Sequence, residues 1–131
     1  MSDANGDTLP AMAADDVRAH IERGDVFLLD LRRSTGSTQI YGAIRYDPKK
    51  LLDAPRLVLP LPKEDGTIVL YDERGDSSNV RAIADKLRAG GYGKLYALDG
   101  GFEAWQAADG RTEERTIEQP VPLVSEHQPE R

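Results

Sequence analysis

Hydrophobic residues gather in three short runs along the chain, and each run is typical of a buried strand. The runs are nearly continuous rather than alternating, as in strands of a parallel sheet that helices cover on both faces. They occupy residues 26–31, 67–71 and 94–98. A shorter strand is expected at 43–46, whereas Pro60 and Pro62 argue against a regular central strand over 57–61.

Helical spacing separates these runs. Over residues 78–89 the apolar positions recur at i, i+3, i+4 and i+7, which predicts an amphipathic helix. Asp47 and Pro48 are typical of an N-cap and a first helical position, so a short helix is expected to follow them. Two more helices are expected at 12–22 and just after Gly100-Gly101. Strands that alternate with helices predict an α/β domain with a mostly parallel sheet.

The length of 131 residues suits one domain with one core. We expect this domain to span residues 11–110. Residues 1–10 are small and polar, which is typical of a disordered segment. Residues 111–131 are charged and contain three prolines, so we expect an irregular C-terminal tail.

Charge and composition exclude several functional classes. The chain has 23 acidic and 17 basic side chains, a net charge of −6, so nucleic acid and anionic membranes are not expected partners. No apolar run approaches the ~20 residues needed to cross a bilayer, and the N-terminus lacks the pattern of a signal peptide. A cytoplasmic location is the default expectation.

The chain has no cysteine, which excludes disulfides, thiolate metal sites and every mechanism that uses a thiol of this chain. Two histidines without cysteine do not favour a zinc site either. No cofactor is expected.

The most informative segment follows the strand predicted at 67–71. In open α/β sheets, ligands bind beyond the carboxyl ends of the strands, and amides before a helix can surround an anion. The residue at this place is an acid, Asp72. The candidate loop consists of Asp72, Glu73, Arg74, Gly75, Asp76, Ser77 and Ser78. Ser77 and Ser78 fit caps of the following helix better than nucleophiles, because no histidine lies near them in sequence.

Four stretches together resemble a single rhodanese domain, the sulfurtransferase fold, over about residues 12–108. They are the strand that ends in Asp30-Leu31-Arg32, Gly42-Ala43, the strand and loop over 68–78, and the Gly-Gly-x-x-x-Trp segment within 98–105. The resemblance implies a three-layer domain with a central, mostly parallel sheet flanked by helices.

The departures from the rhodanese pattern bear directly on activity. The resemblance places Asp72 where the family has the cysteine that carries the persulfide, and a carboxylate cannot carry a sulfane sulfur. Asp72, Glu73 and Asp76 surround Arg74, so the loop is acidic and is expected to bind thiosulfate or phosphate poorly. Gln39 stands roughly where the family often has histidine, and Tyr41 where it has proline.

Three hypotheses about function follow. The leading one is a catalytically inactive rhodanese-like domain that works by binding, as a regulatory or scaffolding module with an unknown protein partner. The second is a metal-dependent hydrolase or phosphotransfer protein that uses Asp72, with Glu73 or Asp76 holding Mg²⁺. The third is an oligomerisation or docking domain that acts through its tail, with a homodimer as one form.

Asp30 and Arg32 also have two interpretations. They could line the pocket beside the loop, or they could form an ion pair that supports the end of the first strand. The ion pair is favoured.

Overall fold

The computed structural model describes residues 9–32, 37–55, 57, 59–61, 63, 66–74 and 78–119. Seven strands and four helices are formed by these residues. In chain order they are β1 (Ala11–Met12), α1 (Ala14–Arg23), β2 (Val26–Asp30), β3 (Thr38–Ile40), β4 (Ile44–Arg45), α2 (Pro48–Asp53), β5 (Thr67–Tyr71), α3 (Ser78–Ala89), β6 (Leu95–Leu98), α4 (Gly101–Ala107) and β7 (Thr112–Glu114).

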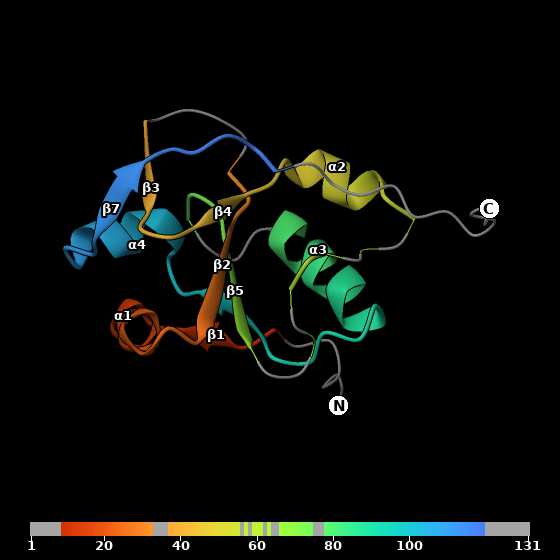
Figure 1. The fold of residues 1–131 in the computed structure, drawn as a ribbon, viewed down its shortest axis with the longest axis horizontal. Coiled ribbons are helices and arrows are strands. Elements are labelled where there is room, and N and C mark those ends of the chain that lie inside the picture. The colour runs from red at the N-terminus through yellow and green to blue at the C-terminus, as the bar shows by residue number, and fades with distance from the viewer. Residues whose placement is uncertain are drawn as a thin grey trace.

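The main sheet has five strands in the order β1-β6-β5-β2-β4, and each of its described pairings is parallel. The helices α1 and α4 cover one face of this sheet, and α2 and α3 cover the other (Figure 1). The α/β fold with three layers is therefore confirmed.

Side chains of β2 and β5 alternate between two cores because successive residues of a strand face opposite sides. Leu29 and Leu70 pack in the core under α2 and α3. Leu28 and Val69 pack in the core that holds Phe102 and Trp105 of α4. Both faces of these strands are thus buried, which explains their continuous apolar sequence.

The helix boundaries follow local signals. The side chain of Asp47 accepts a hydrogen bond from the backbone N–H of Lys49 at 2.9 Å, and Pro48 opens α2 as expected. Gly24 ends α1 in the left-handed conformation, with φ at 74°. The helix predicted over 78–89 is confirmed at both ends.

Two predictions about the ends of elements are wrong. Met12 belongs to β1, not to the first helix, because it pairs with Leu98 of β6. The tail predicted to be irregular from residue 111 begins with the strand β7, which pairs antiparallel with β3.

Among the described residues, no helix has the length and apolar composition that a membrane span requires.

Candidate functional site

The candidate loop begins at the carboxyl end of β5, at the centre of the sheet. The carbonyl oxygen of Asp72 accepts a hydrogen bond from the backbone N–H of Phe102 at 2.9 Å. That of Glu73 accepts one from the N–H of Glu103 at 3.0 Å. The first turn of α4 therefore fixes the first two residues of the loop.

The side chains of the loop are more exposed than its anchor. Arg74 contacts Glu103 at 3.2 Å, and both side chains are mostly in solvent. Gly75, Asp76 and Ser77 lie outside the described residues, so the predicted cap at Ser77 and the contribution of Asp76 stay predictions. Ser78 is the first residue of α3.

Behind the loop, Asp30 and Arg32 form a buried ion pair, as the favoured interpretation had it. Arg32 Nη2 donates to Asp30 Oδ2 at 2.8 Å, and Arg32 Nε donates to Asp30 Oδ1 at 3.1 Å. The two side chains are 3% and 0% exposed for Arg32 and Asp30, respectively. They offer almost no surface to a molecule arriving from solvent.

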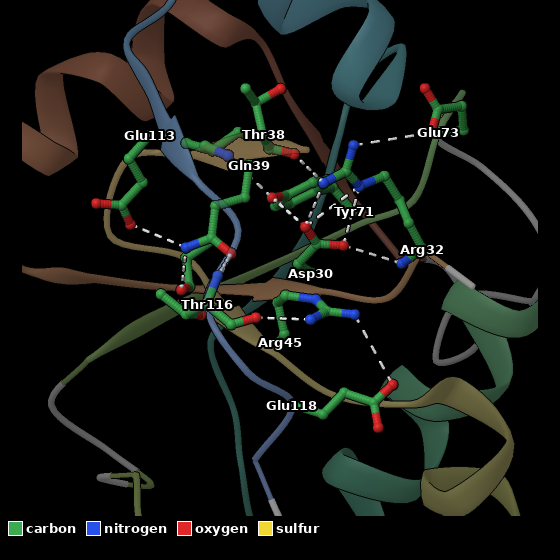
Figure 2. Close-up of polar contacts among 12 residues, drawn as sticks. Asp30, Arg32, Thr38, Gln39, Arg45, Tyr71, Glu73, Glu113, Thr116 and Glu118 are labelled. Atoms are coloured by element: carbon green, nitrogen blue, oxygen red, sulfur yellow. Dashed lines mark hydrogen bonds and ion pairs between the residues drawn. The ribbon is translucent and has the colours of Figure 1, made fainter. Parts of the chain in front are cut away.

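Tyr71, the last residue of β5, completes this buried cluster. Its hydroxyl donates to Asp30 Oδ2 at 2.8 Å and accepts the N–H of Ile40 at 3.2 Å (Figure 2). Burial and the neighbouring Asp30 carboxylate raise the pKa of Tyr71 well above its ordinary value. The tyrosine is therefore a neutral hydrogen-bond donor to the Asp30 carboxylate.

Arg32 connects this cluster to the loop. Its guanidinium lies 4.1 Å from the ring centroid of Phe102, and its Nη1 is 3.9 Å from a carboxylate oxygen of Glu73. Burial disfavours the charged guanidinium, but the hydrogen bonds and the charge of Asp30 prevail and raise the pKa of Arg32. Arg32 therefore stays a cation under all ordinary conditions.

A second polar cluster centres on Gln39, whose side chain is buried. Gln39 Nε2 donates to the carbonyl of Ala43 at 3.0 Å and to Glu113 Oε2 at 2.8 Å. Gln39 Oε1 accepts the N–H of Thr116 at 3.1 Å (Figure 2). The amide thus ties β3 to the segment that contains β7.

The same segment is held further along by Arg45 of β4. Arg45 donates to the carbonyl of Thr116 at 2.6 Å and lies 3.9 Å from Glu118 (Figure 2). Burial, with the nearby Arg45 and Arg32, lowers the pKa of Arg115. The pairing of β7 with β3 and the hydrogen bond from Arg45 of β4 hold residues 111–119 along these two strands. We call this segment the C-terminal strap.

Comparison with known protein families identifies the family of this domain. The profile described as Rhodanese-like domain matches residues 13–108, which is most of the chain. This chain belongs to the rhodanese-like domain family. No significant match was found among curated proteins.

Solved structures agree with the family. A full-length protein from Lactobacillus plantarum is 24% identical, with a TM-score of 0.69, over 80% of this chain and 88% of that one. A rhodanese-like domain from Anabaena sp. is 23% identical, with a TM-score of 0.65, over 95% and 98%. A 3-mercaptopyruvate sulfotransferase from Escherichia coli is 25% identical, with a TM-score of 0.61, over 90% and 58%.

This rhodanese-like domain has no cysteine that could carry a persulfide. The family match lies inside the domain predicted over residues 11–110, whose exact limits stay a prediction. The C-terminal strap lies outside the matched residues.

Sequence reasoning found Asp30, Arg32 and Asp72 but missed the roles of Gln39, Glu113 and Arg45. Gln39 was noted only as a departure at a family position. The sequence of polar Gln39 beside apolar Ile40 does not indicate that the side-chain amide of Gln39 is buried. The partners at 113 and 116 are more than seventy residues away, so no local pattern could reveal them.

Proposed function

We propose that this rhodanese-like domain has no sulfurtransferase activity and acts by binding another molecule, as a regulatory or scaffolding module. One observation carries the first part: a chain with no cysteine has Asp72 at the end of β5, where the family resemblance expects the persulfide cysteine. Sulfur transfer needs a polarizable thiolate, and a carboxylate does not replace it.

Two further features support a binding role. The buried cluster of Asp30, Arg32 and Tyr71 joins the carboxyl ends of β2 and β5 by short hydrogen bonds. The loop beside it presents Glu73 and Arg74 to solvent. An ordered scaffold with a charged, accessible loop suits recognition of a partner.

The direct test is an assay of thiosulfate-to-cyanide sulfur transfer with purified protein. We expect thiocyanate formation equal to that of a heat-denatured control. Formation above the control, proportional to protein concentration, would refute the proposal.

A variant tests whether the missing thiol is the only reason for the expected lack of sulfur transfer. Asp72→Cys should gain little activity, because the Glu73 carboxylate, and that of Asp76 if it lies near, would raise the pKa of the new thiol and repel thiosulfate. Asp72→Cys combined with Glu73→Gln and Asp76→Asn is the matched control and should be the more active of the two. Equal rates for both would show that the loop charge is unimportant.

The two other hypotheses gain no support from the structure. In the part of the chain that is described, no three histidine, aspartate or glutamate side chains gather as a metal site would need. The tail beyond the strap, residues 120–131, lies outside the described residues. The protein partner, a homodimer and the cytoplasmic location stay predictions, and light scattering after size-exclusion would check the homodimer.

A further inference from the structure

The C-terminal strap supplies β3 with its partner strand. β7 pairs antiparallel with β3, and Gln39 lies opposite Glu113 in this pairing. Beyond the pair, the backbone N–H of Tyr41 donates to the carbonyl of Arg111 at 3.0 Å. The residues that match the family end at 108, before the strap begins. The strap therefore completes a small second sheet with a segment from outside the matched domain.

One carboxylate makes the most specific contact of the strap. Glu113 Oε2 accepts hydrogen bonds from Gln39 Nε2 at 2.8 Å (Figure 2) and from the backbone N–H of Gly42 at 2.9 Å. Gln39 is fully buried, so its amide needs partners in the folded protein. Three residues after Glu113, the N–H of Thr116 donates to Gln39 Oε1 at 3.1 Å. Gln39 thus recognises a carboxylate and a backbone N–H at a fixed spacing.

Polar contacts at the surface hold the strap in place. Of residues 111–119, only Glu113 and Arg115 are half-buried, and the others are exposed. None of these nine residues belongs to the two apolar cores formed by the described part of the chain. Segments with few buried apolar contacts open locally at a lower free energy than the whole fold. The strap is therefore able to leave β3 while the main sheet stays folded.

Opening of the strap leaves a strand edge with several polar groups that have lost their partners. The Gln39 amide and the Gly42 N–H lose a carboxylate, and Arg45 Nη1 loses the carbonyl of Thr116, which it contacts at 2.6 Å. Unpaired strand edges bind extended segments of other chains. Because donors at this edge need a carboxylate, an acidic segment fits it even though the net charge of the chain is −6.

We propose that the edge of β3 binds an extended acidic segment of a partner protein, and that the strap occupies this edge as an autoinhibitory competitor. The partner segment places a glutamate at the position of Glu113 and a residue other than proline three positions later, at that of Thr116. The proposal rests on the binding role proposed above and names a partner class for it. The strap limits access to the edge and is not itself the docking surface.

The test uses the full-length protein and a fluorescent peptide with the sequence of residues 110–119, followed by fluorescence anisotropy. The wild type should bind the peptide weakly, because the tethered strap competes at an effective concentration of roughly millimolar. Glu113→Ala in the protein should tighten the binding of the unchanged peptide by about tenfold, because the strap is then open in a larger fraction of molecules.

Glu114→Ala is the matched control, since Glu114 is an exposed neighbour on the same strand. This protein should bind the unchanged peptide as weakly as the wild type does. Circular dichroism verifies that both variants fold. Equal affinities of the Glu113→Ala and Glu114→Ala proteins for the peptide would overturn the proposal.

Variant peptides test the recognition itself. On the Glu113→Ala protein, the Glu113→Ala peptide should bind about tenfold more weakly than the unchanged peptide, whereas the Glu114→Ala peptide should bind as the unchanged one does. NMR supplies a second measurement: the unchanged peptide should return the Gly42 amide of this protein toward its wild-type chemical shift. Equal binding of the two variant peptides, or an unmoved Gly42 signal, would overturn the proposal.

A second change weakens the strap without removing a carboxylate. Thr116→Pro lacks the N–H that bonds to Gln39 Oε1, so this protein should also bind the unchanged peptide more tightly than the wild type does. It provides the same comparison if the Glu113→Ala protein does not fold. An affinity equal to that of the wild type would count against the strap as a competitor.

The sulfur-transfer assay separates this inference from the proposed function. A protein that binds no peptide in any variant and forms no thiocyanate lacks the inferred site but keeps the proposed loss of sulfurtransferase activity. A protein that forms thiocyanate refutes that loss, whether or not it binds the peptide.

Discussion

Arg32 has a carboxylate on each side, and the two differ sharply. Asp30, on the scaffold side, is buried and hydrogen-bonded to Arg32 at 2.8 Å. Glu73, on the loop side, is half exposed and lies 3.9 Å away. The scaffold side is fixed by short buried contacts, whereas the loop side is held by a long contact in solvent. The fold thus constrains Asp30 strictly and Glu73 loosely.

The largest expected effect comes from breaking the buried side. Asp30→Asn should destabilise the protein by ~3–5 kcal/mol, because it removes the buried, hydrogen-bonded counter-charge of the Arg32 guanidinium and leaves only the half-exposed Glu73 carboxylate at 3.9 Å. Glu73→Gln is the matched change on the other side of Arg32 and should cost less than about 1 kcal/mol. Urea unfolding followed by circular dichroism measures both.

Similar losses of unfolding free energy in the two variants would contradict the distinction between the buried Asp30 side and the exposed Glu73 side of Arg32. So would a stable Asp30→Asn protein that unfolds at the wild-type urea concentration.

A smaller effect is expected at the C-terminal strap. Gln39→Ala should lower the free energy of unfolding by about 1–3 kcal/mol, because the partners of the buried Gln39 amide lose their hydrogen bonds. It should also speed amide hydrogen exchange at Thr116. Gln119→Ala is the control: its side chain is exposed, and only its backbone N–H bonds to the carbonyl of Arg45. Equal exchange at Thr116 in both variants would show that Gln39 does not hold the strap.

The smallest expected effect is at an exposed carboxylate far from the loop. The hydrogen bond from His20 to Asp25, 2.8 Å long, holds the pKa of Asp25 below its ordinary value of 3.8. A carboxyl whose pKa is lower in the folded state stabilises the protein above the unfolded value, and this contribution is lost as pH falls through the folded value.

The urea midpoints of wild type and Asp25→Asn should therefore converge as pH falls below 3.8. In a His20→Gln background this dependence on pH should shrink. The same dependence in both backgrounds would contradict the assigned cause.

Much of the fold could be predicted because apolar residues mark it. The strands β2 and β5 and the helix α3 bury continuous or periodic apolar side chains, and local spacing is enough to find them. The strap could not be found in this way, since its half-buried positions, Glu113 and Arg115, are charged. Their environment is set by Gln39 and Arg45, which lie far away in the sequence.

The site was only partly predictable for a related reason. The place of Asp72 follows from the strand before it and from the family resemblance. The ion pair of Asp30 and Arg32 was one of two interpretations, because the sequence of a charged pair two residues apart does not show whether the pair is buried or exposed. The depth of burial comes from Tyr71 and Phe102, which tertiary packing brings to the pair.

The central claim is that the loop of this rhodanese-like domain accepts no sulfur. Intact-protein mass spectrometry after incubation with thiosulfate tests it directly. We predict that the mass of the wild-type protein does not change. The Asp72→Asn protein, treated in parallel, should likewise keep its own mass. A gain of one sulfur atom that cyanide removes, present in the wild type and absent from the variant, would contradict the account.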